Sequence, residues 1–366
     1  MYIESMKKFN IKSNEMPEIV RLELTNTCNM KCPHCRHHSE EKRLPENYPE
    51  YYKNKIFMSE EQIKKIFDEI SPHKPSVTLN VANEPMISPS FKFAVKQIKK
   101  HDLSGTFNTN GLMLNEDMCK FLVEQEFESV NISVDAVTPE TLKKARGITA
   151  LDKLVRNVKR LVNARNEKKL PRVGVTFVVM PYNKNEINKF IDFWKDYADV
   201  IRFTGYITDK CPDISVLPDV EIEKIPPRIP CKQIYRDIVI RANGDITPCV
   251  ITAESPDYIS MGNIFEDGGI RKVWNGKIFQ EWRNLHNQSK WGDISYCKGC
   301  DYWVDSLQPK EKETEEFLIR NPSPYTVFYN VKKRLDNWDS VNLIDRQGFG
   351  NNNFDLMEES ATSEHI

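Results

Sequence analysis

Three cysteines within one short stretch constrain this chain more than any other feature of its sequence. The stretch reads Cys-Asn-Met-Lys-Cys-Pro-His-Cys and runs from Cys28 to Cys35 with the spacing C-x3-C-x2-C. Three thiols cannot all pair as disulfides, and alone they cannot complete a four-thiolate zinc site. Thiolates are soft ligands typical of iron–sulfur clusters, and a [4Fe-4S] cluster held by three cysteines leaves one iron open. The alternative is a zinc site completed by His34, His37 or His38.

The composition favours metal ligation over disulfide bonding. The chain has 366 residues, nine cysteines and a formal net charge of −1. It contains no apolar run long enough to span a membrane and no secretory signal at its start, so we expect a cytoplasmic protein whose thiols stay reduced. The balanced charge argues against a broad basic face for nucleic acid. We therefore expect neither a nucleic-acid partner nor a membrane partner.

Hydrophobic periodicity predicts strands and helices in alternation. The expected strands are Ile19 to Thr25, Val77 to Val81, Gly105 to Thr109, Ser129 to Val134, Arg172 to Val179 and Asp199 to Phe203. Helices are expected between them, one of them starting at the capping box Ser59-Glu60-Glu61-Gln62. This alternation indicates an α/β fold, a partial (β/α)6 TIM barrel, in which the loops after the strands form the active face.

The run from Leu24 to Cys35 closely resembles the cluster motif of radical S-adenosylmethionine (SAM) enzymes. In that family the open iron chelates the amino and carboxylate groups of SAM, and reduction splits SAM into methionine and a 5′-deoxyadenosyl radical. The resemblance implies that Cys28, Cys32 and Cys35 hold the SAM-binding [4Fe-4S] cluster. It places His34 where the family has an aromatic residue beside the adenine. It also implies an electron donor such as flavodoxin or ferredoxin.

Four further segments resemble SAM-binding loops of this family, three of them directly after an expected strand and the fourth farther along the chain. Asn83-Glu84-Pro85 takes the place of a Gly-Gly-Glu-Pro loop that binds the SAM amino group, although Ala82 and Asn83 replace the two glycines. The others are a Thr-Asn-Gly turn near the ribose, a Ser-x-Asp segment near the ribose and methionine, and an Arg-Gly pair near the carboxylate. The cofactor-binding residues that this resemblance implies are His34, Asn83, Glu84, Asn110, Ser133, Asp135 and Arg146.

A second group of cysteines follows a proline-rich junction. Its members are Cys231, Cys249, Cys297 and Cys300. The turn signal Asn243-Gly244 predicts a hairpin that brings the distant cysteines together. Four cysteines make a closed site, for which structural zinc is the general expectation. The segment from Met261 to Trp274, followed by a C-x-x-C pair, resembles the shortened SPASM module called a twitch domain. That resemblance implies one auxiliary [4Fe-4S] cluster.

These motifs divide the chain into four expected parts: a lead-in (1–18), a radical SAM partial barrel (19–210), a small α+β twitch domain (211–303) and an extension (304–366). In the extension, residues 301–336 are expected to pack back as helix, and residues 350–366 to be disordered. A single helix is expected from Gly269 to His286. Cys119 is expected to pack as a small hydrophobic side chain. Cys211, in the loop after the sixth strand, is a candidate hydrogen-atom donor.

The resemblance defines the reaction type more closely than the substrate. We expect a radical SAM oxidoreductase that removes a hydrogen atom from a small-molecule substrate such as a sugar, aminocyclitol or nucleotide-linked sugar. Oxidation, with the auxiliary cluster accepting an electron, is favoured over epimerisation through Cys211. The alternative is a ribosomal-peptide maturase that crosslinks or epimerises its substrate, although only a short segment precedes the first strand, where such enzymes often carry a leader-binding domain. A noncatalytic metal-binding regulator is a third hypothesis.

Overall fold

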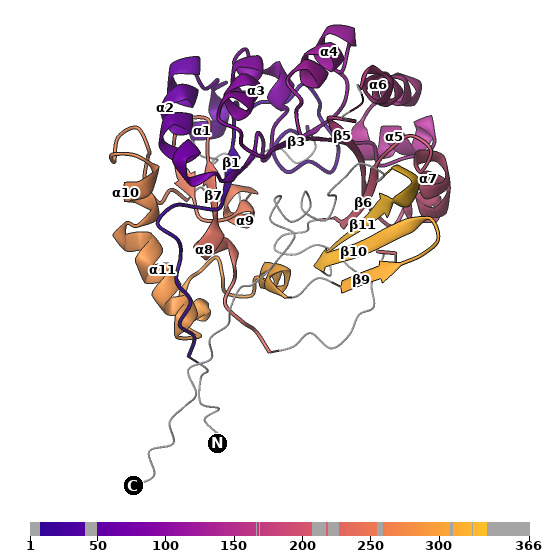
Figure 1. The fold of residues 1–366 in the computed structure, drawn as a ribbon. Helices are drawn as coiled ribbons and strands as arrows, with labels where there is room; N and C mark the ends of the chain where they lie inside the picture. Colours follow the sequence, from indigo (N-terminus) through magenta and orange to yellow (C-terminus); the bar gives the residue numbers. More distant parts are fainter. Residues whose placement is uncertain are drawn as a thin grey trace.

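The computed structural model describes residues 8–40, 50–165, 167, 169–206, 217–218, 227–254, 259–307, 310–323 and 325–334. These residues form one eleven-stranded sheet with the order β8-β7-β1-β2-β3-β4-β5-β6-β11-β10-β9. The sheet curves into an open barrel, and helices α2 to α7 cover its outer face (Figure 1). One continuous hydrophobic core joins this barrel to residues of β7, α10, α11, β10 and β11.

The six central strands run parallel in sequence order. They are β1 (Ile19–Leu22), β2 (Ser76–Thr78), β3 (Gly105–Thr109), β4 (Ser129–Ser133), β5 (Arg172–Val179) and β6 (Val200–Gly205). Successive side chains of a strand point to opposite faces. In β3, Phe107 packs outward against Phe91, with ring centroids 5.1 Å apart, while Thr106 and Asn108 face the barrel interior. The predicted partial (β/α)6 barrel is confirmed.

The covering helices lie between the strands, as the hydrophobic periodicity predicts. They are α2 (Glu60–Ile70), α3 (Phe91–Lys100), α4 (Glu116–Glu124), α5 (Pro139–Arg146), α6 (Leu151–Ala164) and α7 (Ile187–Trp194). The predicted capping box is present, since Ser59 Oγ accepts from Gln62 N at 3.2 Å and Gln62 Oε1 accepts from Ser59 N at 2.9 Å. Cys119 is fully buried in α4, as expected. Within the described ranges, every helix is too short or too polar to cross a bilayer.

The segment that carries the second cysteine group extends the sheet beyond β1. β7 (Asp237–Ile240) runs parallel to β1, and β8 (Ile246–Thr247) completes the predicted hairpin. Gly244 in its turn has a φ of +90°, a conformation that favours glycine. The single helix expected from Gly269 is interrupted at Gly276, where α10 (Ile270–Trp274) gives way to α11 (Lys277–Asn287). Short helices α8 (Gln233–Arg236) and α9 (Val250–Glu254) complete this segment, and the short helix α1 (Glu50–Lys53) lies between β1 and α2.

The helix expected over residues 301–336 is wrong. A 3₁₀ helix at Tyr302–Ser306 is followed by β9 (Lys310–Glu313), β10 (Phe317–Ser323) and β11 (Thr326–Val331). β11 pairs antiparallel with β6 and extends the other edge of the barrel (Figure 1). Its β-branched and aromatic side chains are all buried, as is typical of a strand that has found a sheet partner. The tail expected to be disordered, 350–366, lies outside the described residues.

Candidate active site

The loops that follow the parallel strands open into one cavity of about 420 Å³. Its lining contains nine of the residues that the sequence predicts to bind a cluster or SAM: Cys28, Cys32, Cys35, His34, Asn83, Glu84, Asn110, Ser133 and Arg146. These side chains come from separate loops, and only the barrel places them around one space. The structure therefore brings together nearly the whole predicted cofactor site.

The cysteine loop presents its three thiols on one wall of this cavity. Cys32 is buried, and Cys28 and Cys35 are half-buried. Burial, the largest cause, raises the pKa of Cys28 to about 12, while a hydrogen bond from Met30 N lowers it. A buried thiol is poorly ionised alone but gives up its proton when a metal neutralises the thiolate. The donors therefore fit an iron–sulfur cluster.

No three His, Cys, Asp or Glu side chains of the described residues converge on a point that suits a single metal ion. In a [4Fe-4S] cluster each cysteine binds a different iron, so its ligands need not converge.

Arg146 lies beside this loop and is held by Asp135. The Arg146 Nε and Asp135 Oδ2 atoms are 2.5 Å apart, and Arg146 Nη1 points to Cys32 Sγ at 3.8 Å. Asp135 is fully buried, has a positive φ of 64°, and also accepts a hydrogen bond from Val178 N at 2.6 Å. The structure thus places Asp135 behind Arg146, outside the cavity lining, where it orients the guanidinium.

Glu84 joins the loops that follow β2 and β3. Its buried carboxylate accepts hydrogen bonds from Thr109 Oγ1 at 2.9 Å and from Asn110 N at 2.8 Å. Burial raises the pKa of Glu84 to about 7, although these hydrogen bonds lower it. Asn110 Nδ2 donates in turn to Asn29 Oδ1 of the cysteine loop at 2.7 Å. The predicted SAM-binding residues therefore also hold the cysteine loop in place.

His34 and Asn83 tie the cysteine loop to two further segments. His34 Nδ1 lies 2.7 Å from Ala145 O, at the end of α5, and Asn83 Nδ2 donates to Thr25 O. The His34 ring also meets Tyr206 edge to face, with centroids 6.2 Å apart. The loop is thus fixed on several sides before any cofactor binds.

The second cysteine group is also brought together. Burial is the largest cause that raises the pKa of Cys231, and Coulombic repulsion from Cys249, Cys300 and Cys297 adds to it, so the four thiols lie within reach of one another's charges. Four thiolates suit a four-cysteine iron–sulfur cluster, whereas a single zinc ion would need them to converge on one point, which they do not do among the described residues.

His286, on α11, lies beside the second cysteine group, although the sequence analysis did not predict a role for it. Cys231 N donates to His286 Nδ1 at 3.2 Å, so the ring proton is on Nε2, which lies 3.4 Å from Cys297 Sγ. Burial keeps the imidazole neutral by lowering its pKa to about 3. His286 therefore donates a hydrogen bond to a candidate cluster thiolate.

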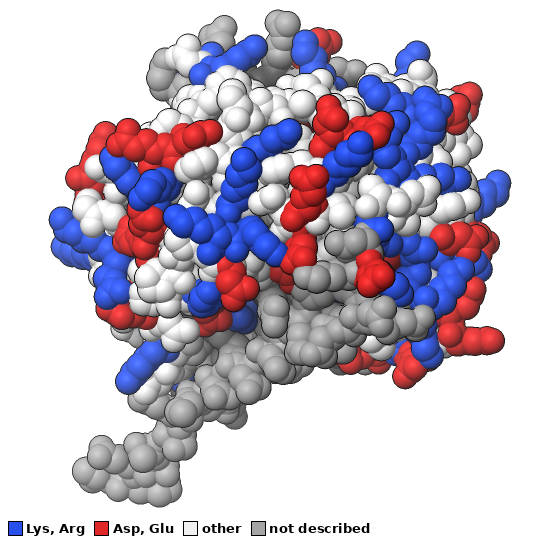
Figure 2. Space-filling model, turned by 45° about the horizontal axis from the view of Figure 1, so that its top comes forward, with Lys and Arg blue, Asp and Glu red and all other residues white. Residues whose placement is uncertain are grey.

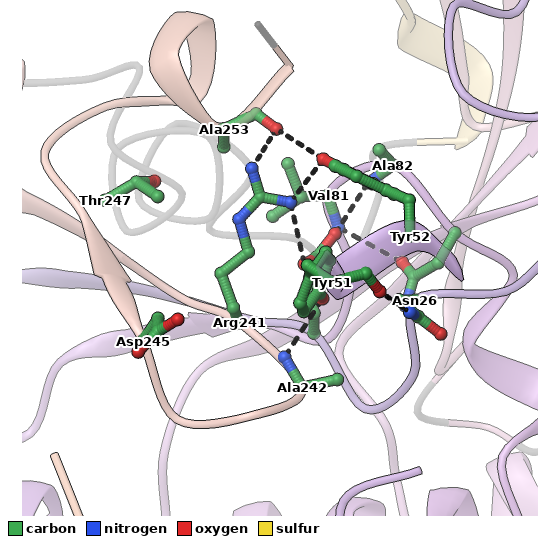
Figure 3. Close-up of polar contacts among 12 residues, drawn as sticks. Asn26, Tyr51, Tyr52, Val81, Ala82, Arg241, Ala242, Asp245, Thr247 and Ala253 are labelled. Carbon is green, nitrogen blue, oxygen red and sulfur yellow. Dashed lines mark hydrogen bonds and ion pairs between the residues drawn. The ribbon is translucent and has the colours of Figure 1, made fainter. Parts of the chain in front are cut away.

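A buried polar network surrounds Arg241, Tyr51 and Tyr52 (Figure 3). Arg241, which is fully buried next to the β7–β8 turn, donates to Tyr52 Oη at 2.7 Å and to Ala253 O. Its Nη1 also lies 3.5 Å from Glu23 Oε2, and Tyr51 Oη donates to the same oxygen at 2.7 Å. Sequence reasoning missed this network, which we call the Glu23–Arg241 network.

The same network reaches the candidate cofactor loops. Glu23 Oε1 accepts from Ala82 N at 3.3 Å, within the loop that follows β2. The His37 ring, two residues after Cys35, stacks on Tyr52 with centroids 5.4 Å apart. The loops around both cysteine groups are therefore joined through a few buried charged and aromatic side chains.

Cys211, the candidate hydrogen-atom donor, lies outside the described residues. On the face shown in Figure 2, basic and acidic side chains are interspersed, without an extended field of one sign among the described residues.

Comparison with known proteins identifies two sequence families. The model of the radical SAM superfamily matches residues 22–193, and the model of an iron–sulfur cluster-binding domain, SPASM, matches residues 231–301. Among curated relatives, the mycofactocin maturase MftC of Mycobacterium tuberculosis (strain CDC 1551 / Oshkosh) is 23% identical over 330 residues, which covers 78% of each chain.

Solved structures share the fold. SuiB of Streptococcus suis, bound to its precursor peptide SuiA, has a TM-score of 0.58 and 13% identity over 74% of this chain and 67% of SuiB. BtrN, in complex with AdoMet and 2-DOIA, has a TM-score of 0.50 and 16% identity over 78% of this chain and 93% of BtrN. At such identities the likeness extends to the fold alone.

Proposed function

We propose that this chain, which belongs to the radical SAM superfamily and carries a SPASM-type iron–sulfur domain, modifies one residue of a peptide substrate. As a radical SAM enzyme it uses a SAM-binding [4Fe-4S] cluster, an auxiliary [4Fe-4S] cluster and SAM. This proposal reverses the order of the hypotheses drawn from the sequence, which placed a sugar-like substrate first and a peptide second.

The relatives support this order. The alignment with the maturase MftC extends through both the barrel and the SPASM segment. SuiB, which shares the fold, was solved with a precursor peptide. Neither likeness assigns a substrate by itself, because one fold carries many activities.

The size of the cavity is the observation that carries the proposal. A volume of about 420 Å³ is at the lower end of the range that holds one drug-sized ligand. SAM must occupy part of this same space, because the candidate cofactor residues line it. The room that remains suits one side chain or a short segment of a larger substrate, whose other residues would lie outside.

The residues of the chain have separate tasks in this proposal. When bound, the cluster and SAM supply a 5′-deoxyadenosyl radical. Cys28, Cys32 and Cys35 hold the cluster, and Arg146, oriented by Asp135, is placed to bind the carboxylate of SAM. Cys231, Cys249, Cys297 and Cys300 hold the auxiliary cluster.

Glu84 serves mainly as a brace for the cofactor loops, because protein donors already engage both of its oxygens.

Oxidation of a small polar molecule is the second candidate. BtrN, which shares the fold, was solved with 2-DOIA. The barrel interior is also rich in hydroxyl and amide side chains that suit a polar ligand: Thr78, Thr106, Asn108, Asn131, Thr176 and Thr204.

A substrate screen distinguishes the two candidates. Anaerobically reconstituted protein is incubated with SAM, a reductant, and either pooled synthetic peptides or a panel of sugars and aminocyclitols. We expect peptides to raise the release of 5′-deoxyadenosine above the rate without substrate and to change in mass. Stimulation by the sugar panel with no response to peptides would contradict the proposal.

A further inference from the structure

Two cations in the cavity have no anionic partner among the residues that the structure describes. Arg202, on β6, and Lys232, directly before α8, both line it. Arg202 Nε is buried without a hydrogen-bond acceptor among the described residues, and the Arg202 guanidinium lies over the Phe328 ring, with Cζ 5.7 Å from the ring centroid. Lys232 is 7% exposed, and its ammonium group makes no hydrogen bond or ion pair with the described residues. Buried charges are normally paired, so this arrangement calls for a ligand.

Three other arginines of the cavity show the contrast. Arg21 pairs with Asp237 at 3.1 Å, Arg236 pairs with Glu18 at 2.6 Å, and Arg146 pairs with Asp135. Their charges are satisfied within the protein. Arg202 and Lys232 differ from these three arginines because they have no acidic partner among the described residues.

The local charge balance suits an anion with one negative charge. Asp305 interacts electrostatically with both Arg202 and Lys232, although neither cation forms a direct ion pair with it. Asp237, which pairs with Arg21, also acts on Lys232. With these acids already nearby, a singly charged carboxylate suits the two cations better than a doubly charged phosphate, and the planar guanidinium fork matches its geometry.

The position of Arg202 places such an anion close to the reaction centre. Ser133 pairs with Thr176 on β5, and Thr176 pairs with Arg202 on β6, so the three side chains form one row facing the cavity. Adjacent strands are about 4.8 Å apart, which puts the backbone of Arg202 about 10 Å from that of Ser133. A substrate anchored on Arg202 would thus lie beside the predicted SAM site.

We propose that Arg202 and Lys232 form a substrate-binding site for a carboxylate of the peptide, either an acidic side chain or the C-terminal carboxylate. The inference rests on the proposed peptide-modifying function. The site would fix which residue of the peptide reaches the SAM-binding end of the cavity.

Peptide binding to the reconstituted holoenzyme with SAM tests this site. The probes are three fluorescein-labelled octapeptide pools: one with a single glutamate and an amidated C-terminus, one with a free C-terminal carboxylate and no acidic side chain, and one with glutamine and an amidated C-terminus. The first two pools distinguish the source of the carboxylate. Fluorescence anisotropy gives the dissociation constants.

We expect one of the two acidic pools to bind at least tenfold more tightly than the neutral pool. Arg202→Gln and Lys232→Gln should abolish this preference, and Arg202→Lys should retain part of it because it keeps the charge without the fork. Arg271→Gln is the matched control, since it removes an exposed cation that pairs with Glu15. SAM affinity and the spectrum of the auxiliary cluster should be unchanged in the two cavity variants.

Three outcomes would each refute one of two claims, the carboxylate site or the peptide function. Equal binding of all pools refutes the carboxylate site and leaves the peptide proposal standing. Binding of galacturonate that depends on Arg202, with no binding of any peptide, refutes the peptide function and leaves the carboxylate site standing. A loss of SAM affinity, or an altered auxiliary-cluster spectrum with intact peptide preference, shows that the two cations serve the cofactors and refutes the site.

Discussion

Replacing Arg241 with methionine tests the Glu23–Arg241 network most directly. The substitution removes the charge, the hydrogen bonds to Tyr52 Oη and Ala253 O, and the cation above the Tyr51 ring, 4.9 Å from its centroid. Glu23 stays buried, with hydrogen bonds from Tyr51 Oη and Ala82 N only. Removing one partner of a buried ion pair costs about 3 to 5 kcal/mol. Since Glu23 keeps two donors, we expect about 3 kcal/mol.

Urea unfolding, followed by tryptophan fluorescence under anaerobic conditions, measures this cost. Arg271→Met is the control, because it breaks an exposed pair with Glu15 that should contribute only about 0 to 1 kcal/mol. The double variant Glu23→Gln/Arg241→Met should be more stable than the sum of the two single effects predicts, because it leaves no unpaired charge. If Arg241→Met unfolds within 1 kcal/mol of the wild type, the buried ion pair does not stabilise the fold as argued.

Four further predictions concern the cofactors and the reaction. The reconstituted protein should hold about eight irons. Replacing Cys28, Cys32 and Cys35 with alanine should leave about four irons and abolish SAM cleavage, whereas replacing the four SPASM cysteines should leave about four irons and retain SAM cleavage. Zinc bound by the four SPASM cysteines would contradict their assignment to an iron–sulfur cluster. Arg146→Gln should raise the dissociation constant of SAM at least tenfold by equilibrium dialysis, and an unchanged value would show that Arg146 does not face the cofactor. His286→Leu removes a hydrogen bond to Cys297 Sγ and should lower the reduction potential of the auxiliary cluster, because such bonds stabilise the reduced state, so an unchanged potentiometric titration counts against it. For Cys211→Ala, turnover in D₂O should still give a product two hydrogens lighter, whereas deuterium gain that the variant abolishes would establish the hydrogen-donor role instead.

The local patterns of the sequence predicted most elements of the barrel. The strand and helix periods of β1 to β6 and α2 to α7, the Ser59 capping box and the Asn243-Gly244 turn all depend on residues close together in the chain. The two short cysteine motifs also depend on residues close together in the chain, and their spacing indicates soft metal ligands. Such patterns can be recognised in a single sequence because residues close together in the chain produce them.

Pairings between distant segments were decided only by the tertiary structure. β11 forms because it pairs with the exposed edge of β6, so the sequence of β11 alone did not predict a strand. The contact of Glu23 with Arg241 depends on β7 lying beside β1. The unpaired charges of Arg202 and Lys232 emerge only once the fold shows which acids lie within reach. Burial and charge balance belong to the assembled cavity, and no local pattern in the sequence encodes them.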